Sequence, residues 1–132
     1  SNIELTPSEA SIALQSLTRM NSRHVQVRSL IQAIGNKLEY VYGNFDPKEV
    51  PSVFYALQSM NESHQEVRVL LPQIWRRIND KDFMYKRGIW SSSPYLLAIS
   101  MEGLSGFTGN DPIIKTMLNF WIYYFFYEIN FL

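Results

Sequence analysis

Apolar residues recur at three- and four-residue spacing over long parts of the chain, which is the pattern of one buried face of an α-helix. On either side of the polar pair Asn21-Ser22 they are Ala10, Ala13, Leu14, Leu17 and Met20, then Val27, Leu30, Ile31, Ile34 and Leu38. Alternating apolar and polar runs of useful length are absent. The pattern therefore predicts an all-α protein.

The chain also repeats itself. Residues 5–38 align without a gap with residues 40 positions later. The identical pairs are Pro7/Pro47, Glu9/Glu49, Leu17/Leu57, Met20/Met60, Asn21/Asn61, His24/His64, Val27/Val67, Arg28/Arg68, Leu30/Leu70 and Ile34/Ile74. A rival offset of 43 matches Ala13–Ser16 with Ala56–Ser59, but the offset of 40 aligns both ends of the unit. A further shift by 47 pairs Pro47 with Pro94, Leu57 with Leu104, Val67 with Ile114 and Leu71 with Leu118.

Each unit is predicted to be a helix–turn–helix, because two apolar helical stretches are separated by a polar break. A helix pair cannot bury its apolar face alone, so neighbouring units must stack. We therefore predict one domain over 1–132, built as a short α-solenoid of three repeats. The predicted parts are repeat 1 at about 5–44, repeat 2 at about 45–79, a loop at 80–91 and a degenerate capping repeat at 92–132.

The starts of the units carry helix signals. Thr6-Pro7, Asp46-Pro47 and Ser93-Pro94 each place an N-cap residue before a proline. Glu9 and Glu49 stand three residues after the first two caps, which predicts a capping box in each case. Asp111-Pro112 repeats the cap and proline at the second helix of the third unit.

Two prolines fall inside predicted helices and one glycine pair marks a helix end. Pro51 and Pro72 each remove a backbone hydrogen bond, so we predict kinks there, including kinked second helices. Gly43-Asn44 is predicted to end the second helix of the first unit.

Composition narrows the function. The 132 residues carry no cysteine and a formal net charge of zero. Zinc–thiolate sites and cysteine nucleophiles are therefore excluded, and a general polyanion binder is disfavoured. A Gly-rich phosphate loop, a nucleophile elbow and metal-ligand spacing are also absent from the sequence. We expect no enzyme, no metal and no cofactor.

The series T/D-P-x-E, A-L-Q-S, M-N and V-R-x-L-L/I resembles the short helical-pair repeats of the octotricopeptide type in organelle RNA-binding proteins. Similar units occur in secreted effectors of intracellular bacteria. The resemblance covers residues 5–78 and, more weakly, 92–125. It implies a superhelical surface that binds RNA or protein, in a cytoplasmic protein or an effector in the host cytoplasm. It also implies that the first helices face the ligand.

Three groups of residues are candidates for binding. A basic ladder joins the repeat-equivalent Arg28, Arg68 and Lys115 and is suited to phosphate or an acidic peptide. The first-helix face carries Gln15, Arg19, Tyr55 and Gln58. The loop mixes bases with aromatic residues at Lys81, Tyr85, Lys86, Arg87 and Trp90, a combination that suits an acidic partner or single-stranded nucleic acid.

A structural role competes with each of these assignments. Charged ladders commonly form solvated faces, Tyr55 and Trp90 can pack in the core, and the paired His24 and His64 more often cap or pack than bind metal.

The C-terminal run FWIYYFFY at 120–127 is too short for a membrane helix, which needs about 20 apolar residues. We expect a buried helix or a contact surface, including self-association through 117–132. The sequence thus favours a non-catalytic protein–protein interaction module, as part of a larger bacterial or effector-like protein. RNA binding is the alternative, and peripheral membrane attachment through the C-terminal aromatic residues is a third hypothesis.

Overall fold

The described part of the chain is entirely helical in its regular structure. The computed structural model describes residues 4–46, 48–78 and 94–131. In the last of these ranges, the burial of side chains is described for residues 98–122. These ranges contain six helices and no strand, which confirms the predicted all-α class. The helices are α1 (Pro7–Gln15), α2 (Val25–Leu38), α3 (Val50–Tyr55), α4 (Gln65–Arg76), α7 (Pro94–Gly103) and α8 (Pro112–Phe131).

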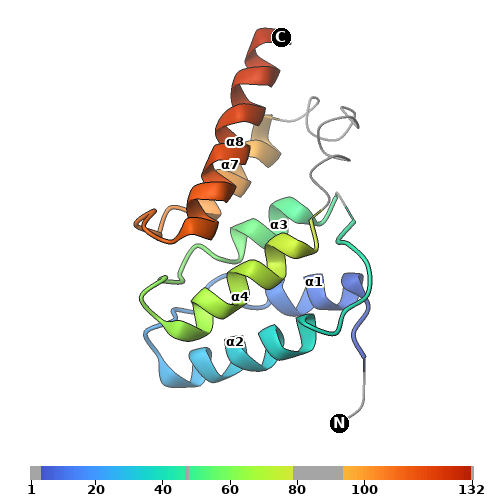
Figure 1. The fold of residues 1–132 in the computed structure, drawn as a ribbon, viewed down its shortest axis with the longest axis vertical. Coiled ribbons are helices and arrows are strands. Elements are labelled where there is room, and N and C mark those ends of the chain that lie inside the picture. Colours follow the sequence, from blue (N-terminus) through green and yellow to red (C-terminus); the bar gives the residue numbers. More distant parts are fainter. Residues whose placement is uncertain (1–3, 47, 79–93, 132) are drawn as a thin grey trace.

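The helices lie in three levels. α1 and α2 form one end of the molecule, α3 and α4 the middle, and α7 and α8 the other end (Figure 1). The first helices contact in chain order, α1 with α3 and α3 with α7. The second helices do the same, α2 with α4 and α4 with α8. Helices at equivalent places in the sequence repeat therefore pack against one another.

The predicted capping box at the start of α1 is confirmed. The Thr6 hydroxyl accepts from the Glu9 N–H at 3.1 Å, and Glu9 Oε1 accepts from the Thr6 N–H at 3.0 Å. At the start of α8, Asp111 Oδ1 accepts from the Ile113 N–H at 2.8 Å, so the cap predicted there is also confirmed. The cap predicted at Ser93 lies outside the described residues.

The capping box predicted at Glu49 is wrong. Asp46 Oδ1 accepts from the Lys48 N–H in a turn, and α3 begins only at Val50. Pro51 consequently lies in the first turn of α3, where its missing N–H leaves no helical bond unmade. The kink predicted at Pro51 is therefore also wrong, because this proline lies in the first turn of α3 and not in the helix interior.

The carboxylate of Glu49 is used elsewhere, since its Oε1 accepts from the Ser8 hydroxyl of the first unit at 3.2 Å.

The first helices are shorter than their apolar pattern suggests. After Gln15 the chain continues in tight turns, in which the Leu17 N–H donates to Leu14 O and the Met20 N–H to Leu17 O. The same bonds recur 40 residues later from Leu57 to Phe54 and from Met60 to Leu57. The three-residue spacing of these turns keeps Leu17 and Leu57 in the core.

The second helices α2 and α4 differ in their prolines and in how they end. Pro72 lies inside α4, which nevertheless continues to Arg76; α4 is the one described second helix with an internal proline. α2 ends at Leu38, five residues before Gly43, so the Gly43-Asn44 stop is misplaced. The helix end is satisfied instead by Arg77 of the next unit, whose Nη2 donates to Leu38 O and Glu39 O at 2.9 and 3.2 Å. Gly43, with φ of 101°, belongs to the connection between units.

One continuous core runs through all three levels. It includes Leu14, Ile31, Phe54, Leu71 and Trp121, all fully or almost fully buried. The Phe54 and Trp121 rings meet edge to face at 5.1 Å, which links the middle level to α8. The stack is therefore held by contacts between units as well as within them.

A glycine sets the closest helix approach. A Cβ atom on Gly103 of α7 would lie 1.8 Å from the carbonyl oxygen of Phe54. Backbone atoms fill that space and cannot move aside cheaply, so only glycine allows α7 to lie this close to α3.

We expect Gly103→Ala to lower the free energy of unfolding by about 1–3 kcal/mol, because the methyl group would force α3 and α7 apart. Gly35→Ala is the matched control. A Cβ there would lie 3.8 Å from Leu70 Cδ1, an ordinary contact, so alanine should add about 0.5–1 kcal/mol through helix propensity. Urea denaturation measures both. Equal stabilities for the two variants would contradict the close approach at Gly103.

Candidate functional site

The first two members of the predicted basic ladder hold the turns of their own units. Arg28 Nη1 donates to Ser22 O at 3.0 Å and to Arg23 O at 2.8 Å. Arg68 Nη1 donates to the equivalent carbonyls of Glu62 and Ser63, at 3.3 and 3.2 Å. Both guanidinium groups therefore satisfy carbonyl oxygens in the turn that joins two helices.

The ladder also reaches across units. Arg28 Nε lies 3.7 Å from Glu66 Oε2, and both side chains are about a quarter exposed. The third member, Lys115, is exposed on α8. The structure thus gives Arg28 and Arg68 structural partners, and their binding of a ligand stays a prediction.

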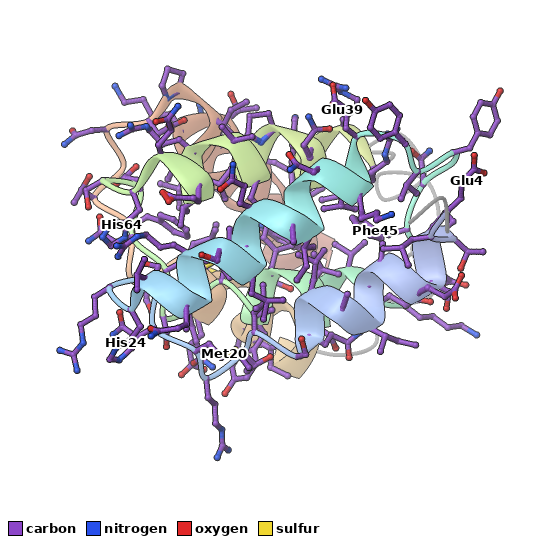
Figure 2. All side chains as sticks on the ribbon, turned by 90° about the horizontal axis from the view of Figure 1, so that it is seen from below. Glu4, Met20, His24, Glu39, Phe45 and His64 are labelled. Carbon is purple, nitrogen blue, oxygen red and sulfur yellow. The ribbon has the colours of Figure 1, made fainter. Side chains whose placement is uncertain are left out.

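The repeated histidines lie at the starts of α2 and α4. Figure 2 shows His24 and His64 at the same edge of the stack, and neither caps its helix through the side chain. His64 Nδ1 lies 3.0 Å from the Ser22 hydroxyl, whose oxygen also accepts from the Asn61 N–H at 2.9 Å. Across the described residues, no group of three or more candidate metal ligands converges.

The next junction uses the same positions with a charged acceptor. Glu62, equivalent to Ser22, is buried and accepts from both the N–H and the hydroxyl of Thr108. Its second oxygen accepts from the Asp111 N–H at 3.2 Å. Thr108 and Asp111 are the equivalents of Asn61 and His64.

The hydrogen bonds at this junction decide the titration of Glu62. Burial by itself would raise the pKa of this carboxyl, but the hydrogen bonds from Thr108, Asp111 and Gly109 together outweigh it and the pKa lies below its ordinary value of 4.5. The ionised form is therefore the form that the fold stabilises.

We expect Glu62→Gln to cost about 1–3 kcal/mol of unfolding free energy near neutral pH, because charge-assisted hydrogen bonds are lost. A lowered folded-state pKa adds stability above the ordinary pKa of 4.5, and this is lost as the pH falls through the lower folded value. The difference between wild type and variant should therefore shrink in acid. Urea denaturation across this pH range measures it, and a difference independent of pH would contradict the role of the charge.

The predicted first-helix residues take mainly structural positions. Gln15 is half-buried and its amide donates to the Ser11 hydroxyl at 2.8 Å. Gln58 Nε2 donates to Thr18 O of the preceding unit at 2.7 Å. Tyr55 is half-buried at the end of α3, and Arg19 is exposed in the turn after α1. Gln58 thus links two units, whereas Arg19 alone of the four is fully on the surface.

A hollow lies elsewhere, on the outer surface between α2 and α4. It has a volume of about 220 Å³. Its lining is Ile31, Gln32, Gly35 and Asn36 from α2, and Gln65, Glu66 and Val69 from α4. Gly35 takes the place that Trp75 has in the second unit, so a side chain is missing where the repeat otherwise carries one.

The rim of this α2/α4 hollow is polar and its floor is apolar. Gln32, Asn36 and Gln65 are exposed, and within the described ranges their side-chain amides make no hydrogen bond. Val69, which is 48% exposed, supplies apolar surface between them, and Ile31 lies fully buried beneath. Such a site can hold one apolar side chain and offer donors and acceptors to the polar groups beside it.

Sequence reasoning missed this site. The available signal was Gly35, a glycine at a position of the helical apolar face, flanked by Gln32 and Asn36 at four-residue spacing. That spacing places the two amides on one helix face. The contribution of α4 depends on how the units stack and has no local signal.

The predicted loop residues Lys81, Tyr85, Lys86, Arg87 and Trp90 lie outside the described residues, as do the side chains of Tyr123–Tyr127. Among the helices that are described, none combines the length and apolarity that a membrane crossing requires.

Comparison with known proteins gave no matching family model, curated protein or solved structure.

Proposed function

We propose that this chain is a short α-solenoid of three helix-pair repeats, of the kind that the octotricopeptide resemblance implies, and that it binds a polypeptide partner in the α2/α4 hollow. Recurrent bonds between units support the repeat arrangement. Ser22 of the first unit and Glu62 of the second accept hydrogen bonds from the equivalent N–H groups of Asn61 and Thr108 in the following unit. Arg28 and Arg68 also close equivalent turns.

The observation that carries the binding proposal is the hollow left by Gly35. A glycine inside a helix costs about 0.5–1 kcal/mol relative to alanine, and here an alanine would fit without a clash. Glycine at this position therefore keeps the hollow open at the expense of stability. Sites that trade stability in this way are commonly functional.

The lining defines the chemistry of the partner. The exposed Val69 suits an apolar side chain of modest size, and the amides of Gln32, Asn36 and Gln65 suit a peptide backbone. Glu66 is already paired with Arg28, so the site has little net charge to offer. The partner is thus a peptide segment with one apolar anchor and no run of charges.

The alternative of RNA binding through the basic ladder has less support. Arg28 and Arg68 donate to turn carbonyls, which uses part of the donor capacity that phosphates would need. With a net charge of zero, the chain also lacks the positive field that drives sequence-independent binding.

A random peptide library displayed on phage tests the proposal. We expect selected peptides to carry a central aliphatic residue, and to bind Val69→Asp at least about tenfold more weakly, since about 1.4 kcal/mol of apolar contact is lost. Gly35→Ala should weaken binding while it raises stability. Ile12→Asp, an equally drastic change at an exposed residue of α1, is the control that should bind as wild type does.

Fluorescence anisotropy with the selected peptides provides the constants. Peptides that bind Val69→Asp and Gly35→Ala as well as wild type would overturn the assignment of the hollow. A single-stranded RNA pool, tested at low and moderate salt, is the competing probe. Tight binding that falls steeply with salt would favour the RNA alternative instead.

A further inference from the structure

The α7/α8 end of the stack exposes apolar residues at positions that the other units bury. Met101 of α7 is 44% exposed and Leu118 of α8 is 36% exposed. Their equivalents in the second unit, Phe54 and Leu71, are fully buried, as are Leu14 and Ile31 in the first. Phe54 contacts Trp121 of the following unit, so this set of positions faces the next unit along the stack.

The α1/α2 end exposes a second, different set. Leu30 is 39% and Met20 37% exposed, whereas the equivalent Leu70, Met60 and Met117 are buried. Leu70 Cδ1 lies 3.8 Å from the Cβ position of Gly35, which shows that this set faces the preceding unit. Figure 2 looks onto this end, with α1 and α2 in front and Met20 at the turn between them.

The two exposed sets are complementary in register. At the inner junctions Phe54 of the forward-facing set packs on Trp121 of the next unit, and Leu70 of the backward-facing set lies beside Gly35 of the preceding unit. The forward-facing side chains of Met101 and Leu118 are uncovered at the α7/α8 end. The backward-facing side chains of Met20 and Leu30 are uncovered at the α1/α2 end of the same molecule. A second copy of this chain therefore presents, on its α1/α2 end, the kinds of side chain that an inner junction would place over Met101 and Leu118.

We infer that two copies bind end to end, with the α1/α2 end of one molecule on the α7/α8 end of another. The inference rests on the repeat arrangement proposed above, but it uses a surface separate from the α2/α4 hollow. It refines the predicted self-association through 117–132 by adding the opposite end of the molecule as its partner surface. Because the two surfaces differ, the contact is heterologous and can extend into open chains.

The junction between molecules is weaker than the inner ones. Gly109 stands where Ser22 and Glu62 provide the side chain that accepts bonds from the next unit. A glycine has no side-chain acceptor, so the intermolecular junction lacks this polar link. The association is consequently reversible and depends on protein concentration.

Complementary surface variants test the geometry. Leu118→Asp blocks the α7/α8 end and Leu30→Asp blocks the α1/α2 end, each at a partly exposed position where the charge is tolerated by the fold. We expect the wild type to form dimers and larger species as its concentration rises, in sedimentation velocity or light scattering. Each variant alone should stay monomeric. An equimolar mixture of the two should form a one-to-one dimer that grows no further, because each molecule keeps one intact end.

Other outcomes would overturn the inference. A wild type that stays monomeric at high concentration excludes self-association. A Leu30→Asp variant that still dimerises indicates a symmetric contact between two α7/α8 ends instead. Circular dichroism and thermal unfolding confirm that each variant is folded.

Val69→Asp separates this inference from the peptide-binding proposal. It should assemble as wild type does but fail to bind peptide, whereas Leu118→Asp should bind peptide and fail to assemble.

Discussion

In the first two helix pairs, a side chain at the turn forms hydrogen bonds with the helix pair that follows. Ser22 in the first unit and Glu62 in the second accept from backbone N–H groups of the unit that follows. Arg28 and Arg68 hold the carbonyl oxygens of the same turns, which keeps each acceptor in place. With the turns aligned, equivalent helices meet along their length and their apolar faces merge into one core. The hollow and the exposed ends both follow from this alignment.

Local features of the structure could be read from the sequence. The apolar spacing gave the helical class, and Thr6 with Glu9 gave the start of α1, because capping depends on residues a few positions apart. The same logic failed at Glu49. Pro51 is an equally good start signal four residues later than Pro47, and the side chain of Glu49 bonds to Ser8 in another unit. The sequence thus offers two helix starts, at Pro47 and at Pro51, and in the structure the helix forms at the second.

The candidate site depended on contacts that no local pattern reports. Arg28 and Arg68 looked like a free basic ladder because their periodicity was visible and their carbonyl partners were not. Gln58 looked like a ligand contact, whereas it bonds to the preceding unit. The hollow depends on Gly35, which has no side chain to fill it, and on α4, which forms its other wall. The position of α4 cannot be read from the sequence around Gly35. Periodicity therefore located the equivalent positions, and the stack determined what each one does.

The change from serine to glutamate at the turn gives the molecule two unlike joints under mechanical load. Tension along the stack axis would act on neutral hydrogen bonds at Ser22 but on charge-assisted ones at Glu62. In neutral solution Ser22 is thus the weaker of the two turn acceptors, and the first joint is reinforced instead by the Gln58 and Arg77 hydrogen bonds and the Arg28–Glu66 ion pair. Acid, by neutralising Glu62, removes the charge from the second joint while the Gln58 and Arg77 bonds of the first joint persist.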